Sequence, residues 1–163
     1  MNKRVALWSF FVVMMLCCCF SCQTKLDDFV FTYSLESPGN YKIQVSFDDQ
    51  KNYKVERYNY FMDNFARKRD PKILEGTLTD GEFEQVRAVL GEARIFDMND
   101  SYGFEKEVSS KDMGEVLTQV YLKSEGKEKY ISIRDMMNEK FPQGYIKLVK
   151  FINQFCVDHP VDE

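Results

Sequence analysis

Four carboxylates in the second half of the chain have the residue type and spacing for acid–base chemistry. Asp97, Asp100, Glu105 and Glu107 follow one another closely, and pairs of such groups act as general acid and general base in glycoside hydrolysis. That chemistry depends on the distance between two carboxyl groups in space, which sequence spacing does not fix. A carboxylate-dependent hydrolase is therefore one hypothesis for this chain.

The same stretch has some features of a calcium-binding loop. Asp97, Asn99 and Ser101 place oxygen atoms at alternate positions, as such a loop does. The sixth position is Tyr102, where the sharp turn requires glycine, and the twelfth is Val108, where a bidentate glutamate belongs. We interpret the stretch as a polar loop that caps its own backbone. With no Gly-rich phosphate loop or nucleophile elbow elsewhere, the sequence predicts neither a metal site nor a cofactor, and it favours no enzyme class.

A second group of residues has the composition of a partner-binding surface. Tyrosine and arginine are enriched at the residues that contribute most to protein interfaces. One stretch combines aromatic and cationic side chains, namely Arg57, Tyr58, Tyr60, Phe61, Phe65, Arg67, Lys68 and Arg69. The alternative is that Tyr58 and Tyr60 face the core and that the basic residues form a solvated loop.

The N-terminus has the pattern of an export signal. A cationic start, with Lys3 and Arg4, precedes a run of 16 mostly apolar residues from Val5 to Phe20, and Cys22 follows Ser21. This arrangement resembles the signal of bacterial lipoproteins, which implies cleavage before Cys22 and diacylation of that cysteine. Cleavage before Cys19 is the alternative, as is an uncleaved anchor, although the run is short for a membrane span of roughly 20 residues.

The cysteines have a simple distribution under that interpretation. Residues 17–19 lie inside the signal and Cys22 carries the lipid, so that Cys156 is the remaining thiol. Cys156 falls on the apolar face of an expected helix, where cysteine acts as a small hydrophobic residue. A catalytic thiol is the alternative, with His159 as its histidine neighbour.

Charge and the residue after the lipid predict the location and exclude one class of partner. Without residues 1–21 the chain has 142 residues, with 20 basic against 26 acidic side chains. The net charge of about −6 disfavours nucleic acid as a partner. Gln23 is not aspartate, and the resemblance to lipoproteins of Gram-negative bacteria then implies the outer membrane, with the periplasmic or cell-surface face undecided. We expect residues 1–21 as signal, 22–28 as tether, 29–158 as one α+β domain and 159–163 as a tail.

Alternation of apolar and polar residues predicts the elements that position these groups. Period-two patterns indicate strands, which we expect over residues 29–35, 41–47, 53–61, 73–78, 116–122 and 130–133. A helix should begin at Thr79, because Thr79 and Glu82 have capping-box spacing, and end near Gly91. A second helix should begin near Pro142 and bury an apolar stripe that includes Leu148. We therefore predict a two-layer α+β fold, a mainly antiparallel sheet of about six strands with two helices on one face.

The order of these motifs resembles that of uncharacterised small bacterial lipoproteins. The likeness runs through the strand and capped helix at 76–83, Phe96, and the loop at 100–103. It implies a lipid-anchored domain without a known activity. We expect a non-catalytic binding or assembly module at the outer membrane, with the membrane contacted through the lipid and a protein or glycan as partner. An acidic inhibitor or immunity-type protein against a secreted enzyme or toxin is the second hypothesis, and the hydrolase is the third.

Overall fold

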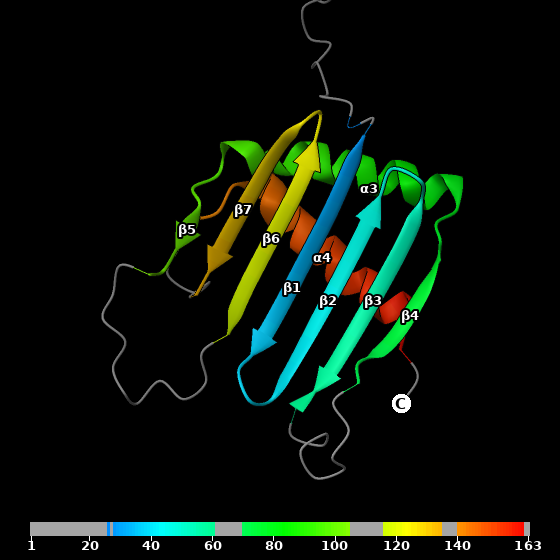
Figure 1. Cartoon of the computed structure of the whole chain (residues 1–163). Helices are drawn as coiled ribbons and strands as arrows, with labels where there is room; N and C mark the ends of the chain where they lie inside the picture. Colours follow the sequence, from blue (N-terminus) through cyan, green and yellow to red (C-terminus); the bar gives the residue numbers. More distant parts are fainter. Residues whose placement is uncertain (1–25, 27, 61–69, 105–115, 135–139, 162–163) are drawn as a thin grey trace, which may run out of the picture.

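The computed structural model describes residues 26, 28–60, 70–104, 116–134 and 140–161. Within them, seven strands form one sheet with the order β4-β3-β2-β1-β6-β7-β5 (Figure 1). All neighbouring strands are antiparallel except β5 and β7, which run parallel. The strands are β1 (Phe29–Ser37), β2 (Tyr41–Asp48), β3 (Asn52–Asn59), β4 (Lys72–Thr77), β5 (Ser101–Tyr102), β6 (Leu117–Ser124) and β7 (Lys127–Ile133).

A tight turn sets the register of the β6–β7 hairpin. Ser124 pairs with Lys127, so that the loop contains the two residues Glu125 and Gly126. Both have positive φ, 51° and 75°, as the turn that matches the twist of a two-residue hairpin requires. Glycine adopts this conformation without steric strain. The turn therefore fixes which side chains of β6 and β7 share a face.

The first helix, α3 (Asp80–Ala93), begins with the capping box that the sequence predicts. The Thr79 hydroxyl accepts a hydrogen bond from the Glu82 N–H, while the Glu82 carboxylate accepts one from the Thr79 N–H. The helix continues past Gly91 and ends where Arg94 takes a left-handed conformation, with φ 51°. A short 3-10 helix, η1 (Ile95–Asp97), follows directly.

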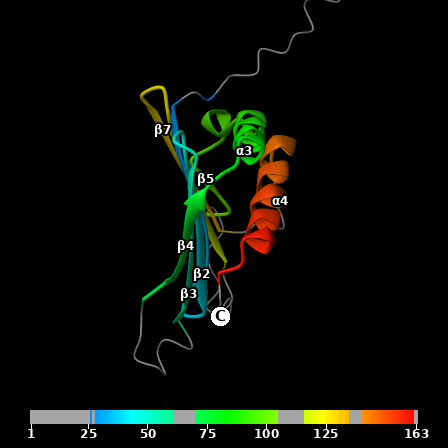
Figure 2. The ribbon, with the colours of Figure 1, turned by 90° about the vertical axis from the view of Figure 1, so that its right-hand side faces the viewer.

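The second helix, α4 (Gln143–Asp158), starts after Pro142. It packs beside α3 with a very close backbone approach, because a Cβ atom on Gly144 would lie 1.8 Å from the Glu92 carbonyl oxygen. Both helices lie on the same side of the sheet (Figure 2). Neither helix in the described part of the chain is long and apolar enough to cross a membrane.

The hydrophobic core lies between the helices and this one face of the sheet. Alternate residues of β1, Phe29, Phe31 and Tyr33, are almost completely buried there. From the helix side, Leu148 and Phe155 enter the same core, and the Phe155 ring meets the Phe47 ring edge-on with centroids 5.0 Å apart.

The predicted two-layer α+β fold, with a mainly antiparallel sheet and two helices on one face, is confirmed, with seven strands where about six were expected. The additional strand is β5, whose two residues are too few to show alternation. Its pairing with β7 depends on a contact between distant segments.

Candidate functional site

The sheet face that points away from the helices, called the open face below, is the candidate binding surface. It is uncovered among the described residues, and the viewer looks onto it in Figure 1. Its side chains are the other alternate set of each strand, because successive residues point to opposite faces. Polar side chains form its centre in the paired register of β7, β6, β1 and β2, namely Ser132, Gln119, Gln44, Thr32 and Ser46, around Ser34, which is only 4% exposed.

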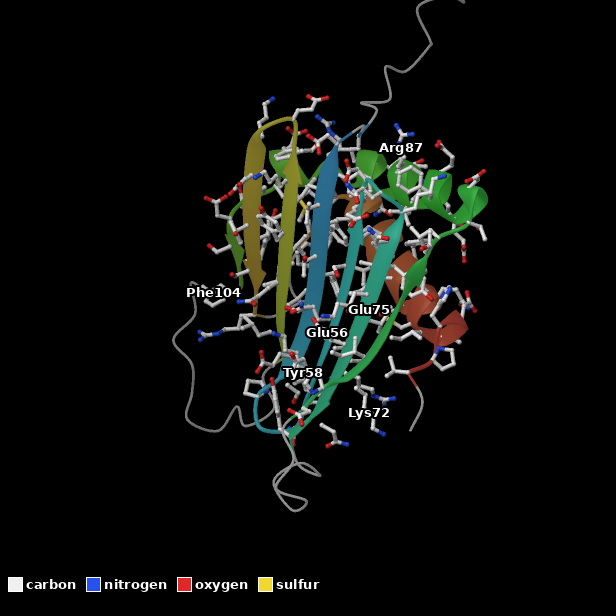
Figure 3. The ribbon with its side chains drawn as sticks, turned by 45° about the vertical axis from the view of Figure 1, so that its right-hand side comes forward. Glu56, Tyr58, Lys72, Glu75, Arg87 and Phe104 are labelled. Carbon is white, nitrogen blue, oxygen red and sulfur yellow. The ribbon has the colours of Figure 1, made fainter. Side chains whose placement is uncertain are left out.

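A polar network crosses three strands of the open face. The Gln44 amide donates a hydrogen bond to the Glu56 carboxylate at 2.8 Å. The Lys54 ammonium lies 3.2 Å from Glu56 and 3.3 Å from the Glu75 carboxylate. Hydrogen bonds to Glu56 and then to Glu75 raise the pKa of Lys54. Figure 3 shows Glu56 and Glu75 on this part of the sheet. The network holds extended side chains in defined positions and contributes little to stability, since exposed ion pairs contribute about 0 to 1 kcal/mol.

One tyrosine pair lies on the β6–β7 side of the open face. Tyr121 and Tyr130 are directly opposite each other in the register, and their ring centroids are 4.5 Å apart. Tyr130 is 66% exposed. Desolvation, followed by the nearby Glu128 carboxylate, raises the pKa of the Tyr121 hydroxyl. Exposed, mutually supported rings of this kind provide contact area at a small entropic cost.

A second tyrosine cluster lies near the end of β3. The Lys42 ammonium sits over the Tyr58 ring, 5.7 Å from its centroid, and the Tyr60 ring centroid is 6.1 Å from that of Tyr58. The Tyr60 hydroxyl donates a hydrogen bond of 3.3 Å to the Glu36 carboxylate. Desolvation raises the pKa of Tyr60, and the negative charge of Glu36 adds to the effect. The cluster thus joins β1, β2 and the residue that follows β3.

The sequence-predicted binding stretch is only partly within this cluster. Tyr58 and Tyr60 contact open-face residues, so the alternative in which both face the core is wrong. The physical reason is that Val55 occupies the buried face of β3, which places Tyr58 on the opposite face and the exposed Arg57 on the helix side. The remaining predicted residues, Phe61, Phe65, Arg67, Lys68 and Arg69, lie outside the described residues.

A shallow hollow of about 590 Å³ lies on the open face near the β2–β3 turn. Ser46, Lys54 and Glu75 contribute polar side chains to it, and Val30 contributes an apolar one. The Asp48 carboxylate also lines it but accepts hydrogen bonds from the backbone N–H groups of residues 50 and 52. Asp48 therefore stabilises the β2–β3 turn. The rest of the lining combines polar and apolar side chains, as protein contact surfaces do.

Of the four predicted acid–base carboxylates, the two in the described part of the chain, Asp97 and Asp100, are each paired with a separate cation. Asp97 forms an ion pair of 2.7 Å with Arg94, and Asp100 is paired with Lys129. Both carboxylates are largely exposed, at 61% and 83% of their side-chain area. Exposed carboxylates that are each paired with a different cation do not face a common substrate, as the acid and base of a glycoside hydrolase must. Glu105 and Glu107 lie outside the described residues.

The calcium-like loop is organised by its aromatic side chain. The Tyr102 hydroxyl accepts a hydrogen bond of 3.0 Å from the Asn99 N–H, and the Tyr102 ring packs on Phe141 with centroids 5.1 Å apart. Gly103 takes the positive φ of 77°. Among the described residues no group of three or more His, Cys, Asp or Glu side chains is close enough to hold a metal ion.

Cys156 and His159 both pack against residues of the hydrophobic core. Cys156 is half-buried against the core, and burial raises the pKa of its thiol, the opposite of what a reactive thiolate needs. The His159 ring stacks on Phe155 with centroids 4.1 Å apart, and its Nε2 atom lies 3.6 Å from the Glu82 carboxylate. The histidine thus extends the aromatic layer between α4 and the sheet.

The segment expected to be a tether contains a core residue. Leu26 is 8% exposed, and its carbonyl oxygen accepts a hydrogen bond of 3.0 Å from Arg87 Nε on α3. Sequence reasoning missed this contact, because a single leucine between charged residues has no periodic pattern. Cys19 and Cys22 themselves lie outside the described residues.

Neither the protein-family models nor the curated proteins contain a match to this chain. In the described residues, the topology defines an α+β protein with one helix-covered sheet face and one open face.

Proposed function

We propose that this protein is a lipid-anchored, non-catalytic binding or assembly module at the bacterial outer membrane, and that the open face is its binding surface. The observation that carries the binding role is the contrast between one covered sheet face and one uncovered face with positioned polar groups and two tyrosine clusters. Aromatic residues surrounded by small polar ones are typical of recognition surfaces.

The carboxylate chemistry supports binding over hydrolysis. A hydrolase requires two carboxyl groups that face a common substrate. Asp97 and Asp100 are instead exposed and paired with separate cations, Arg94 and Lys129. On the open face, Glu56 and Glu75 share Lys54. In both places the carboxylates are already paired with cations, and this supports a structural role for each of them.

The charge of the open face selects among binding partners. Its acidic side chains have positive or hydrogen-bonding neighbours: Glu56 and Glu75 have Lys54, Glu128 has Lys123, and Glu36 has Tyr60. Because these carboxylates are already paired or hydrogen-bonded within the face, a basic toxin or enzyme would have to displace those neighbours to contact them. The small polar centre and the tyrosines instead favour a partner rich in hydroxyl or amide groups, either a glycan or a protein surface. An inhibitor or immunity role is the second outcome that the experiments below can reveal.

The anchor is tested by metabolic labelling with an alkyne-bearing fatty acid. The full chain should be labelled, the Cys19→Ala variant should be labelled equally, and the Cys22→Ala variant should lose the label. Labelling that survives Cys22→Ala but disappears in Cys19→Ala would move the lipid to Cys19. No labelling in any of the three proteins would remove the lipid from the proposal.

The binding surface is tested with a photo-crosslinking amino acid in intact cells. One variant carries it at Gln119, exposed at the centre of the open face, and the matched control carries it at Lys150, exposed on the outer side of α4. A discrete adduct should form from position 119 alone, and it should weaken at least several-fold when Tyr130→Ala is added. An adduct that forms equally from position 150, or that Tyr130→Ala leaves unchanged, would contradict a role for the open face. A basic secreted enzyme in the adduct would favour the inhibitor.

A further inference from the structure

The chain is fixed to the folded domain only a few residues after the expected lipid site. Leu26 is buried, and Arg87 holds its carbonyl oxygen at 3.0 Å. Arg87 is itself positioned, with its guanidinium 5.6 Å from the centroid of the Phe83 ring and 3.0 Å from the Glu84 carboxylate. Figure 3 shows Arg87 at the end of the molecule where β1 begins. Leu26 is therefore held against α3 both by the burial of its side chain and by a hydrogen bond from a positioned arginine.

This attachment lies at one defined end of the sheet, called the Leu26 end below. Phe29 pairs with Ser124, and its carbonyl oxygen accepts a hydrogen bond of 3.0 Å from the Asp49 N–H. The β2–β3 turn and the β6–β7 turn are therefore beside the start of β1, as Figure 1 shows at the top of the molecule. The β1–β2 turn, with Asn40, is at the opposite end.

The length of chain before Leu26 limits how far the domain can stand from its anchor. Four residue steps separate Cys22 from Leu26, and a fully extended chain covers at most about 3.6 Å per residue, or about 14 Å in all. A domain held this close to its lipid has little freedom to change its orientation relative to the membrane. We propose that the Leu26 end rests on the lipid headgroups of the membrane and that the strands point away from it. This inference depends on the lipid at Cys22 that is proposed above.

Charge at the Leu26 end does not provide a competing explanation for this orientation. Lys51 is paired with Asp80 at 2.7 Å and Lys123 with Glu128 at 3.2 Å. The exposed Lys127 lies between two acidic residues of the same hairpin, Glu125 and Glu128. Neutralised lysines give little attraction to anionic lipids. The short attachment sets the orientation, and added salt should leave it unchanged.

The orientation also places the open face. Strand β1 has nine residues, which at about 3.3 Å each extend roughly 30 Å. The Tyr58 cluster lies near the far end of the strands, since Tyr58 pairs with Lys42 close to the β1–β2 turn. Lys42 pairs in turn with Glu36, seven residue steps from Phe29, so the cluster lies about 23 Å beyond the start of β1. A partner that is not embedded in the same membrane can reach it there.

The test compares two fluorescent labels on the mature lipidated protein in vesicles of phosphatidylethanolamine and phosphatidylglycerol. Cys156→Ser removes the remaining thiol, and a cysteine is then introduced as Lys127→Cys at the Leu26 end or as Asn40→Cys at the opposite end, both exposed positions. Lipids with a nitroxide headgroup should quench the label at 127 at least threefold more than the label at 40. Equal quenching at the two positions would overturn the orientation.

Two further variants test whether the short attachment at Leu26 causes the orientation. A flexible spacer of about twelve Gly/Ser residues between Gln23 and Thr24 adds roughly 20 Å of reach and should make quenching at the two labels similar. Leu26→Ser should do the same by releasing the contact, and the spacer keeps the test valid if that variant does not fold. Flotation with the vesicles reports the anchor independently: protein that does not float contradicts the lipid, while protein that floats with equal quenching contradicts only the orientation.

Discussion

The two faces of one sheet differ sharply in burial in this molecule. On β1, Phe29, Phe31 and Tyr33 are almost fully buried beneath the helices, while Val30, between them on the other face, is 43% exposed. Burial of large apolar side chains supplies most of the free energy of folding, so the covered face carries the stability. The open face, with its surface networks, can change its side chains with little effect on folding and is free to serve recognition.

The largest expected effect comes from the centre of the covered face. Leu148 is fully buried, and Leu148→Ala should lower the free energy of unfolding by about 2 to 5 kcal/mol. Lys147→Ala is the matched control, because its ion pair with Glu92 at 2.8 Å is exposed and should contribute about 1 kcal/mol or less. Urea unfolding followed by circular dichroism measures both. Equal midpoints would mean that α4 is peripheral to the core.

The close approach of the two helices predicts the next effect. A Cβ atom at Gly144 would meet the Glu92 backbone carbonyl, which cannot rotate away as a side chain can. Gly144→Ala should therefore destabilise by about 1 to 3 kcal/mol. In contrast, Gly81→Ala has open space around the new methyl group and should stabilise by about 0.4 to 1 kcal/mol. Thermal unfolding of the two variants measures both effects. A loss of stability in Gly81→Ala equal to that in Gly144→Ala would contradict the close approach of the two helices.

The buried hydroxyl of Tyr145 predicts a smaller effect on the free energy of unfolding, and this effect depends on pH. Tyr145 is fully buried, and its hydroxyl has no hydrogen-bond partner among the described residues. Tyr145→Phe should therefore stabilise by about 1 kcal/mol at neutral pH.

The pH dependence of that variant follows from the same burial. Desolvation raises the pKa of Tyr145 well above its ordinary 10.0. The unfolded chain releases this proton above about pH 10 and the folded chain retains it, so stability falls as pH rises beyond that point. Tyr145→Phe should reduce the alkaline loss, while Tyr33, whose pKa burial also raises, should keep part of it. An alkaline profile unchanged by Tyr145→Phe would show that the hydroxyl ionises freely in the native state.

The smallest stability effect is expected on the open face. Tyr130→Ala removes one ring of the pair with Tyr121 and should cost about 0.2 to 1 kcal/mol. The same variant is expected to weaken partner binding several-fold, so that stability and recognition separate. A loss as large as that of Leu148→Ala, in the same urea titration, would show that both faces hold the fold together.

Sequence patterns could predict which residues share a face and that helices cover one face of the sheet, but in β3 they left open which face is covered. Alternation in β3 groups Lys54, Glu56 and Tyr58 whether or not helices lie above them. The helix stripe around Leu148 predicts a buried helix because its pattern is long and regular. Leu26, β5 and the contact of Gly144 with Glu92 depend on segments distant in sequence, and no local pattern indicates them.

The place of β1 in the sheet has a mechanical consequence. Its hydrogen bonds to β2 and β6 run along nearly its whole length, and Leu26 leads into its first residue. With the proposed lipid at residue 22, a force transmitted from the membrane would pull β1 along its own axis, between two flanking strands. Under such shear the backbone hydrogen bonds on both sides share the load and must break together. The chain thus enters the domain through a strand that is hydrogen-bonded along both of its edges.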